Sequence, residues 1–139
     1  MNGSGVVGVG VDAVDVKRFG EILARRPGFA ARYFTESEQA DARSSADQTE
    51  SLAARFAAKE AVMKSLGVGL GAFGFTEVEV CRSLAQGFNR NAPSIVLHGG
   101  AATLATEHGA GIFHVSLTHT TDMAIAFVVA ERVDACAPS

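Results

Sequence analysis

Four charged residues interrupt an alanine-rich stretch between residues 55 and 67, and their types could support chemistry. Alanine and straight-chain residues favour a helix here, and Gly67 is expected to end it. Glu60 and Lys64 lie four residues apart, so they share a helix face. A carboxylate flanked by cations suits a magnesium-bound phosphate, because the acid holds the metal and the bases hold phosphate oxygens. Spacing alone favours a simpler interpretation, a solvated helix face with one ion pair.

A second carboxylate ends a continuous apolar run near the N-terminus, at residues 5–12. Such a run predicts a buried strand. Side chains alternate along a strand, so Gly8, Gly10 and Asp12 share one face and valines occupy the other. The glycines allow another backbone or a ligand to approach the Asp12 carboxylate. Because a buried, unpaired carboxylate is costly, we expect Asp12 to have a cationic partner, either Arg18 or a metal ion.

A third polar group lies between two strands predicted within residues 113–130. Apolar residues alternate with His114, Ser116 and Thr118, and His119 stands at the start of the turn. A single turn histidine more often has no function. Here it follows a strand that ends in hydroxyl residues, an arrangement that commonly mounts phosphate-contacting groups on a scaffold.

The elements that must position these groups alternate between helices and strands. Asp15 is expected to cap the first helix, and Thr35 with Glu38 forms a capping box for the third. We expect an α+β fold, in which one long helix packs on a small antiparallel sheet. The predicted elements are strand 5–12, helices 15–26, 29–34, 36–43 and 51–66, strands 76–82 and 94–98, helix 100–108, and strands 112–118 and 123–131.

The length of 139 residues predicts one domain, which we place at residues 1–132, followed by a frayed tail at 133–139. No apolar run is long enough to span a bilayer, and no basic region precedes the N-terminal apolar stretch. Two distant cysteines, Cys81 and Cys136, are interpreted as free thiols. These features predict a cytoplasmic protein without a membrane partner.

The net charge of −3 conceals a basic segment between residues 16 and 34. Five bases stand there against a single acid, Glu21, which suggests an acidic partner. Nucleic acid is not favoured, because the segment is short and lacks interleaved stacking aromatics. An ordinary solvated helix face is the alternative for any single arginine. The bases are Lys17, Arg18, Arg25, Arg26 and Arg32.

These segments together resemble the small holo-acyl-carrier-protein synthases, the compact branch of the 4′-phosphopantetheinyl transferases. The resemblance rests on a Gly-x-Gly-x-Asp strand at residues 8–12, an Arg-Phe-Ala-Ala-Lys-Glu-Ala helix at 55–61 followed by Lys64, and a Val-Ser-x-Thr-His hairpin at 115–119. Residues 34–38 also match the start of the family's second helix. The resemblance implies a homotrimer with active sites shared between neighbouring subunits.

It further implies transfer of the 4′-phosphopantetheine arm from coenzyme A to a serine of an apo acyl carrier protein, with Mg²⁺, in fatty-acid or polyketide synthesis. The catalytic residues would be Asp12, Glu60 and Lys64, with the two acids as metal ligands. The basic segment would meet the acidic carrier through Arg18, Arg25, Arg26 and Arg32. Coenzyme A contacts are implied for Arg55, Phe56, Lys59, Lys64, Gly67, Thr118 and His119.

The sequence departs from the family pattern before the Arg-Phe helix, where the loop at residues 44–50 has no basic residue. The contacts to the nucleotide 3′-phosphate therefore remain unassigned, as do the general base and the tolerance of acylated coenzyme A. The motif before the late strand is also stretched, over residues 87–93. Two alternatives stay open: a metal-dependent nucleotide phosphohydrolase, and a non-catalytic module that binds carrier proteins.

Overall fold

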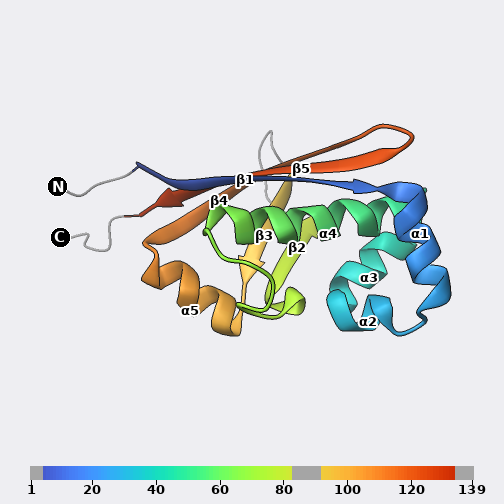
Figure 1. Cartoon of the computed structure of the whole chain (residues 1–139), viewed down its shortest axis with the longest axis horizontal. Coiled ribbons are helices and arrows are strands. Elements are labelled where there is room, and N and C mark those ends of the chain that lie inside the picture. The colour runs from blue at the N-terminus through green and yellow to red at the C-terminus, as the bar shows by residue number, and fades with distance from the viewer. Residues whose placement is uncertain (1–4, 83–91, 134–139) are drawn as a thin grey trace.

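The computed structural model describes residues 5–82 and 92–133, and its α+β arrangement agrees with the expected class (Figure 1). The sheet lies on one side of the long helix α4, while α1 to α3 gather at one end of α4 and α5 lies at the other. The elements are β1 (Gly5–Asp15), α1 (Val16–Arg25), α2 (Phe29–Tyr33), α3 (Glu36–Arg43), α4 (Gln48–Ser65), the 3-10 helix η1 (Phe75–Glu77), β2 (Val78–Arg82), β3 (Pro93–Leu97), α5 (Gly99–Glu107), β4 (Ala110–His119) and β5 (Met123–Arg132).

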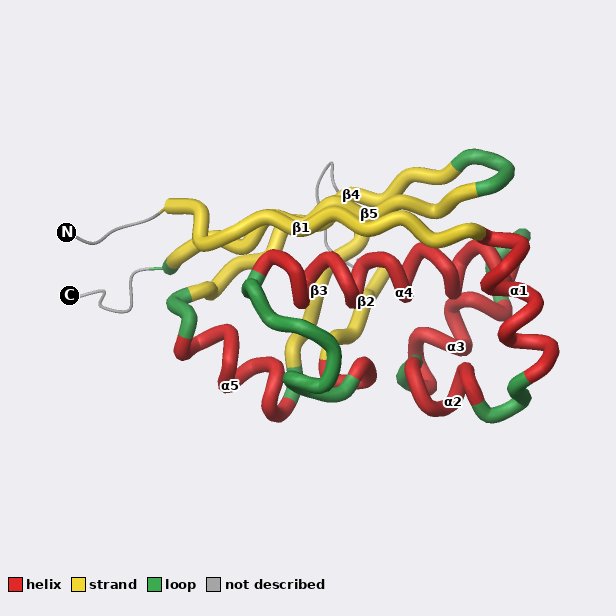
Figure 2. The backbone as a smooth tube through the Cα atoms, viewed as in Figure 1, coloured by secondary structure: helices red, strands yellow, loops and turns green. Residues whose placement is uncertain are grey.

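Three strands form the main sheet in the order β1-β5-β4, and all neighbours are antiparallel. A separate antiparallel pair, β2 and β3, runs across α4 at a steep angle to that sheet (Figure 2). The buried residues of α4 include the small side chains of Ala57, Ala61 and Val62, which share one core with Ala126 and Val128 of β5. Because these side chains are small, α4 and the sheet can approach closely.

The glycine face of β1 is used for this approach, as the alternation predicted. A Cβ on Gly10 would lie 1.9 Å from the carbonyl oxygen of Ala61, and one on Gly8 would lie 2.0 Å from that of Ser65. Only glycine, which has no Cβ, fits at positions 8 and 10. The sequence left open whether a backbone or a ligand comes close, and the structure assigns the space to the α4 backbone.

Both ends of α4 are defined by local hydrogen bonds. The Asp47 carboxylate accepts from the Glu50 amide at 3.0 Å, so the helix begins three residues before the predicted position 51. At the other end, Gly67 has φ 71° and its amide donates to Lys64. The Val68 amide donates to Met63, which completes a Schellman motif. Gly67 ends the helix as predicted.

A second core holds α1, α2 and α3 against the first half of α4. Phe19 and Phe34 are buried at its centre together with Leu52. The Thr35 hydroxyl accepts from the Glu38 amide, and the Glu38 carboxylate accepts from the Thr35 amide, which confirms the capping box. This cluster fixes where the basic helix α1 stands relative to α4.

The start of β2 differs from the expected strand boundary. The strand predicted from residue 76 begins as the 3-10 turn η1, since Glu77 donates its amide to Gly74 instead of to a neighbouring strand. Cys81 is a free thiol, whereas Cys136 lies outside the described residues. Within the ranges 5–82 and 92–133, no helix combines the length and hydrophobicity needed to cross a membrane.

Candidate functional site

A cluster of three charged side chains joins β1 to the last turns of α4. The Lys64 ammonium lies 2.9 Å from Asp12 Oδ1 and 3.0 Å from the carbonyl oxygen of Val11. Asp12 contributes to raising the pKa of Glu60, so the two carboxyl groups are neighbours in this cluster. The sequence therefore identified the three members of this cluster. Arg18 is not the partner of Asp12: it lies in the first turn of α1, where its backbone amide donates to Asp15.

The surroundings of the Glu60 carboxyl group disfavour its ionisation. Partial burial raises the pKa of Glu60 from 4.5 to about 7, and the hydrogen bond and negative charge of Asp12 act in the same direction, against Lys64. Near neutral pH Glu60 therefore retains its proton for much of the time. A bound cation would replace that proton and relieve the repulsion.

The donor chemistry fits Mg²⁺. Two carboxylates meet at a surface position, since the Asp12 side chain is 15% exposed and that of Lys64 is 55% exposed. Among the residues that the structure describes, no group of three or more His, Cys, Asp or Glu side chains could hold a metal. Mg²⁺ commonly takes one or two carboxylates and keeps its other positions for water and substrate phosphates.

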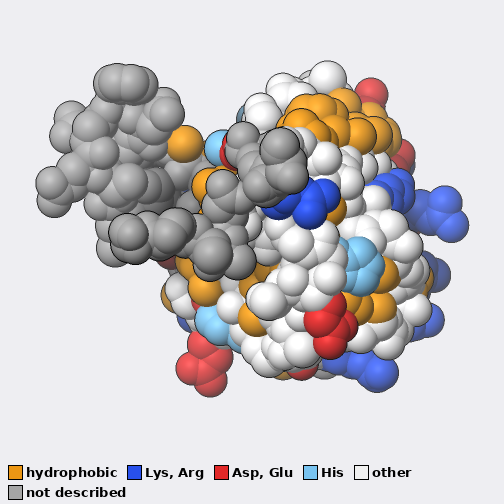
Figure 3. Space-filling view, turned by 90° about the vertical axis from the view of Figure 1, so that its left-hand side faces the viewer, with side chains coloured by type: hydrophobic (Ala, Val, Ile, Leu, Met, Phe, Trp, Pro, Cys, Tyr) orange, Lys and Arg blue, Asp and Glu red, His pale blue; other side chains and the backbone are white. Residues whose placement is uncertain are grey.

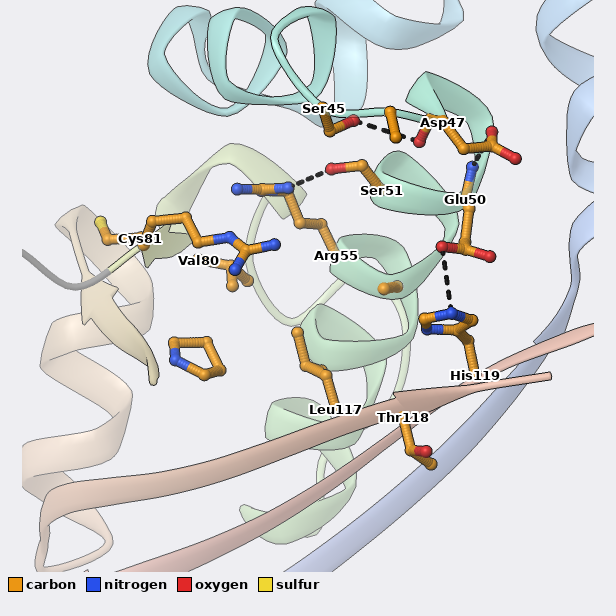
Figure 4. Close-up of a pocket in the computed structure, with 14 residues that line it drawn as sticks. Ser45, Asp47, Glu50, Ser51, Arg55, Val80, Cys81, Leu117, Thr118 and His119 are labelled. Atoms are coloured by element: carbon orange, nitrogen blue, oxygen red, sulfur yellow. Dashed lines mark hydrogen bonds and ion pairs between the residues drawn. The ribbon is translucent and has the colours of Figure 1, made fainter. Parts of the chain in front are cut away.

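A pocket of about 450 Å³ opens beside the first half of α4 (Figure 4). Its walls come from the start of α4, the adjoining ends of β2 and β3, and the end of β4. Arg55, Thr118 and His119, three of the residues expected to contact coenzyme A, face it. The lining residues are Ser45, Ala46, Asp47, Glu50, Ser51, Ala54, Arg55, Val80, Cys81, Arg82, Pro93, Leu117, Thr118 and His119.

Arg55 carries the most constrained charge in this pocket. Its guanidinium donates to Ser51 Oγ and to Asp41 Oδ2, the latter at 3.4 Å, while its buried Nε has no partner. Burial lowers the pKa of Arg55 from its usual value, and the charge of Asp41 opposes this effect. Arginine remains protonated in proteins. A buried donor without a partner on a pocket wall is a place where a ligand acceptor would fit.

His119 lies at the end of β4, and its Nε2 is 3.4 Å from Glu50 Oε1 (Figure 4). Glu50, Ser51 and Arg82 were not expected at this site. Ser51 stands four residues before Arg55 on α4, a spacing that would have revealed the pair. Nothing in the spacing connects Arg82 or Glu50 with residues far along the chain.

The structure places the two groups of residues at separate positions on the chain. Asp12 belongs to β1 at one edge of the main sheet, whereas His119 belongs to β4 at the other edge, with β5 between them. Asp12, Glu60 and Lys64 do not line the pocket. One subunit therefore presents a carboxylate cluster and a separate arginine-histidine pocket.

Lys59 departs from its expected place beside the coenzyme A phosphates. Its side chain has no exposed surface, and its ammonium lies 2.7 Å from Glu38 Oε1. The same ammonium donates to the carbonyl oxygens of Phe75, at 2.9 Å, and Val78. These three bonds use all its donors. Burial lowers the pKa of Lys59, opposed by the charge of Glu38. The expected phosphate contact is therefore corrected to a structural ion pair.

Phe56 is also displaced from the pocket in which it was expected. It belongs to the aromatic cluster around α1 and α2 and stacks on Phe75, with ring centroids 5.0 Å apart at an angle of 9°. An aromatic ring at this helix position faces away from Arg55, because consecutive helical residues point about 100° apart. Gly67 lies at the end of α4 and outside the pocket.

The four arginines expected to meet a partner are exposed. Arg18 and Arg25 are seven residues apart within α1, so they fall near one face. α1 ends at Arg25, and Arg32 belongs to α2, where its guanidinium lies 5.9 Å from the Tyr33 ring centroid. The predicted stripe is therefore continuous only between Arg18 and Arg25.

Comparison with known proteins identifies the family. The family model described as "4'-phosphopantetheinyl transferase superfamily" matches residues 8–128. A holo-[acyl-carrier-protein] synthase of Frankia casuarinae is 48% identical over 126 residues, covering 91% of this chain and 98% of the relative.

Solved structures extend the likeness to the fold. The Helicobacter pylori holo-[acyl-carrier-protein] synthase in complex with coenzyme A has a TM-score of 0.74 at 28% identity and covers 88% of this chain and 98% of that one. The Bacillus anthracis holo-(acyl-carrier-protein) synthase in complex with CoA (3',5'-ADP) has a TM-score of 0.71 at 30% identity, with coverages of 92% and 98%. The chain therefore belongs to the 4'-phosphopantetheinyl transferase superfamily.

Proposed function

We propose that this protein transfers the 4′-phosphopantetheine arm of coenzyme A to a serine of an apo acyl carrier protein and releases adenosine 3′,5′-bisphosphate. The observation that carries the proposal is the Asp12–Glu60 carboxylate pair with Lys64 beside it, in a chain of this family. The names of the curated relatives and the coenzyme A bound in the solved structures support the same reaction.

Asp12 and Glu60 are the residues that would hold Mg²⁺, which when bound neutralises charge on the coenzyme A diphosphate. Lys64 extends from the same helix face, so its ammonium can move from Asp12 to a substrate oxygen and add positive charge near the leaving group. The serine hydroxyl must lose its proton as it attacks phosphorus. A carboxylate of the pair, or a water molecule, is the acceptor.

Arg55, Thr118 and His119 provide the nucleotide end of the coenzyme A site. Since the carboxylate cluster lies at the opposite sheet edge, we propose that each active site combines the cluster of one subunit with the pocket of another, in a homotrimer. The outer sheet face supports association: Val9, Val11 and Phe127 are 55%, 54% and 46% exposed. Hydrophobic side chains also gather at the top of Figure 3, the side on which the sheet lies in Figure 1. Such a face favours burial between subunits.

The exposed bases of α1 and its neighbourhood are the proposed docking surface for the acidic carrier. Arg18 and Arg25 form its centre, and Arg26 and Arg32 extend it. Opposite charges steer such partners together, at a rate that falls as salt rises. A carrier of fatty-acid or polyketide synthesis is the expected substrate, and the cytoplasm is the expected location of this reaction.

One experiment separates transfer from the two alternatives. The protein is incubated with coenzyme A, Mg²⁺ and an apo acyl carrier protein, and the carrier is weighed by mass spectrometry while nucleotide products are separated. Addition of the arm supports the proposal. Nucleotide cleavage with an unmodified carrier indicates a phosphohydrolase, and binding of the carrier without either change indicates a non-catalytic module.

A further inference from the structure

Two arginines from different elements share a wall of the nucleotide pocket. Arg55 comes from α4, and Arg82 is the last residue of β2. Figure 4 shows the Arg55 side chain pointing from α4 toward the strand that carries Cys81, the neighbour of Arg82. The two positive charges repel each other, and the charge of Arg82 contributes to lowering the pKa of Arg55.

The charges on the pocket wall decide whether it can hold an anion. Two carboxylates also line it: Glu50 beside His119, and Asp47, which caps α4. With Arg55 as the only permanent cation, the wall would carry more negative than positive charge and would repel a phosphate. Because Arg55 is already paired with Asp41, Arg82 offsets part of the negative charge of Glu50 and Asp47, and a protonated His119 would add positive charge. Within residues 5–82 and 92–133, no acid lies within 4.0 Å of the Arg82 guanidinium to neutralise it.

The pocket also offers hydrogen-bond donors for a phosphate group. The buried Nε of Arg55 lacks a partner, and its terminal nitrogens are only partly used, since the contact to Asp41 is 3.4 Å long. A phosphate monoester carries a charge of about −1.5 to −2 at neutral pH and three acceptor oxygens. Two guanidinium forks match that charge and geometry better than one.

We propose that Arg82 binds the 3′-phosphate of coenzyme A together with Arg55, and so determines the preference for a nucleotide that carries a phosphate monoester on its ribose. The loop at residues 44–50 has no basic residue that could bind this phosphate, and Arg82 would supply the positive charge instead. The inference rests on the proposed function, because that function brings the nucleotide of coenzyme A to this pocket.

The test compares coenzyme A with 3′-dephospho-coenzyme A as arm donors. Steady-state KM and kcat are measured for the parent protein, Arg82→Ala, Arg82→Lys and Arg43→Ala. Arg43 is a matched control, an exposed arginine at the end of α3 that does not line the pocket. Calorimetry with adenosine 3′,5′-bisphosphate and adenosine 5′-monophosphate gives a second reading that does not depend on turnover.

Loss of one charge-assisted contact should raise the KM for coenzyme A about ten-fold in Arg82→Ala, against less than about two-fold for the dephospho donor. Arg82→Lys should recover part of the loss, and Arg43→Ala should retain the parent's preference. The bisphosphate should lose affinity in Arg82→Ala while the monophosphate does not. Equal changes for both donors, or an unchanged preference, would overturn the role of Arg82. If the parent protein transfers no arm from either donor, the proposed function fails instead, and calorimetry still decides whether Arg82 recognises the phosphate.

Discussion

Glu60 combines its proposed role as a metal ligand with a cost to stability at alkaline pH. Partial burial and the neighbouring Asp12 carboxylate raise its pKa from 4.5 to about 7. The folded state therefore binds this proton more tightly than the unfolded chain does. In the absence of metal, the stability that Glu60 contributes is complete below pH 4.5 and is lost as the pH rises through about 7.

We expect Glu60→Gln to be more stable than the parent at pH 8 without metal, but inactive in transfer. The gain should be on the order of 1–2 kcal/mol after allowance for solvent screening, because the amide avoids burying a carboxylate charge and also removes the repulsion with Asp12. The neutral amide cannot supply the charge that holds the metal. Urea unfolding at pH 5 and pH 8, with a chelator and with Mg²⁺, measures this. A variant that is less stable than the parent at pH 8 would contradict the assigned carboxylate pair.

The Lys59 ammonium is fully buried in an ion pair with Glu38, and we assign this pair a structural role. We expect Lys59→Met and Glu38→Gln each to lower the free energy of unfolding by about 3–5 kcal/mol, because each variant leaves a buried partner without its counterpart. The double variant should lose less than the sum of the two. Denaturant unfolding of the four proteins measures this coupling. If Lys59→Met had normal stability but bound coenzyme A weakly, the result would support the coenzyme A contact expected from the sequence.

At the scale of elements, the packing of α4 on β1 controls the site. Asp12 meets Glu60 and Lys64 only because the glycines of β1 let the helix backbone approach the strand. We expect Gly10→Ala to lower stability by about 3 kcal/mol or more and to reduce transfer, since the new Cβ would collide with the backbone carbonyl oxygen of Ala61, which the helix holds in place. Gly28→Ala is a matched control, because a Cβ there meets nothing within 4 Å. Melting temperature and arm transfer are measured for both variants. If Gly10→Ala behaves like Gly28→Ala, the close approach does not position the site.

Features with local causes were predictable from the sequence. The Thr35–Glu38 box placed α3 at Glu36–Arg43, as expected, and Gly67 placed the end of α4. The alternation in β1 identified the glycine face. The partner of Lys59 could not be found this way, because Glu38 is 21 residues away and only the tertiary fold brings them together. The same reason hid Arg82, which reaches the pocket from β2, and the approach of Glu50 on α4 to His119 on β4.

At the scale of the whole molecule, the separation of the two site halves has a direct consequence. The carboxylate cluster lies on β1 and the arginine-histidine pocket lies at the end of β4, on opposite edges of the sheet. If sites are shared between subunits, a defect in one half can be compensated by a neighbour that has a defect only in the other half.

We expect mixtures of Asp12→Ala and Arg55→Ala proteins to regain activity that neither shows alone. Random reassembly of equal amounts should give intact halves at about a quarter of the shared interfaces. Each variant is dissociated in mild denaturant, mixed and refolded, and arm transfer is measured beside each variant treated alone. Mixing without dissociation is the control, because subunits that do not exchange cannot form new interfaces. Recovery only after exchange places the two halves on different chains, since a site contained within one subunit would stay inactive in every mixture.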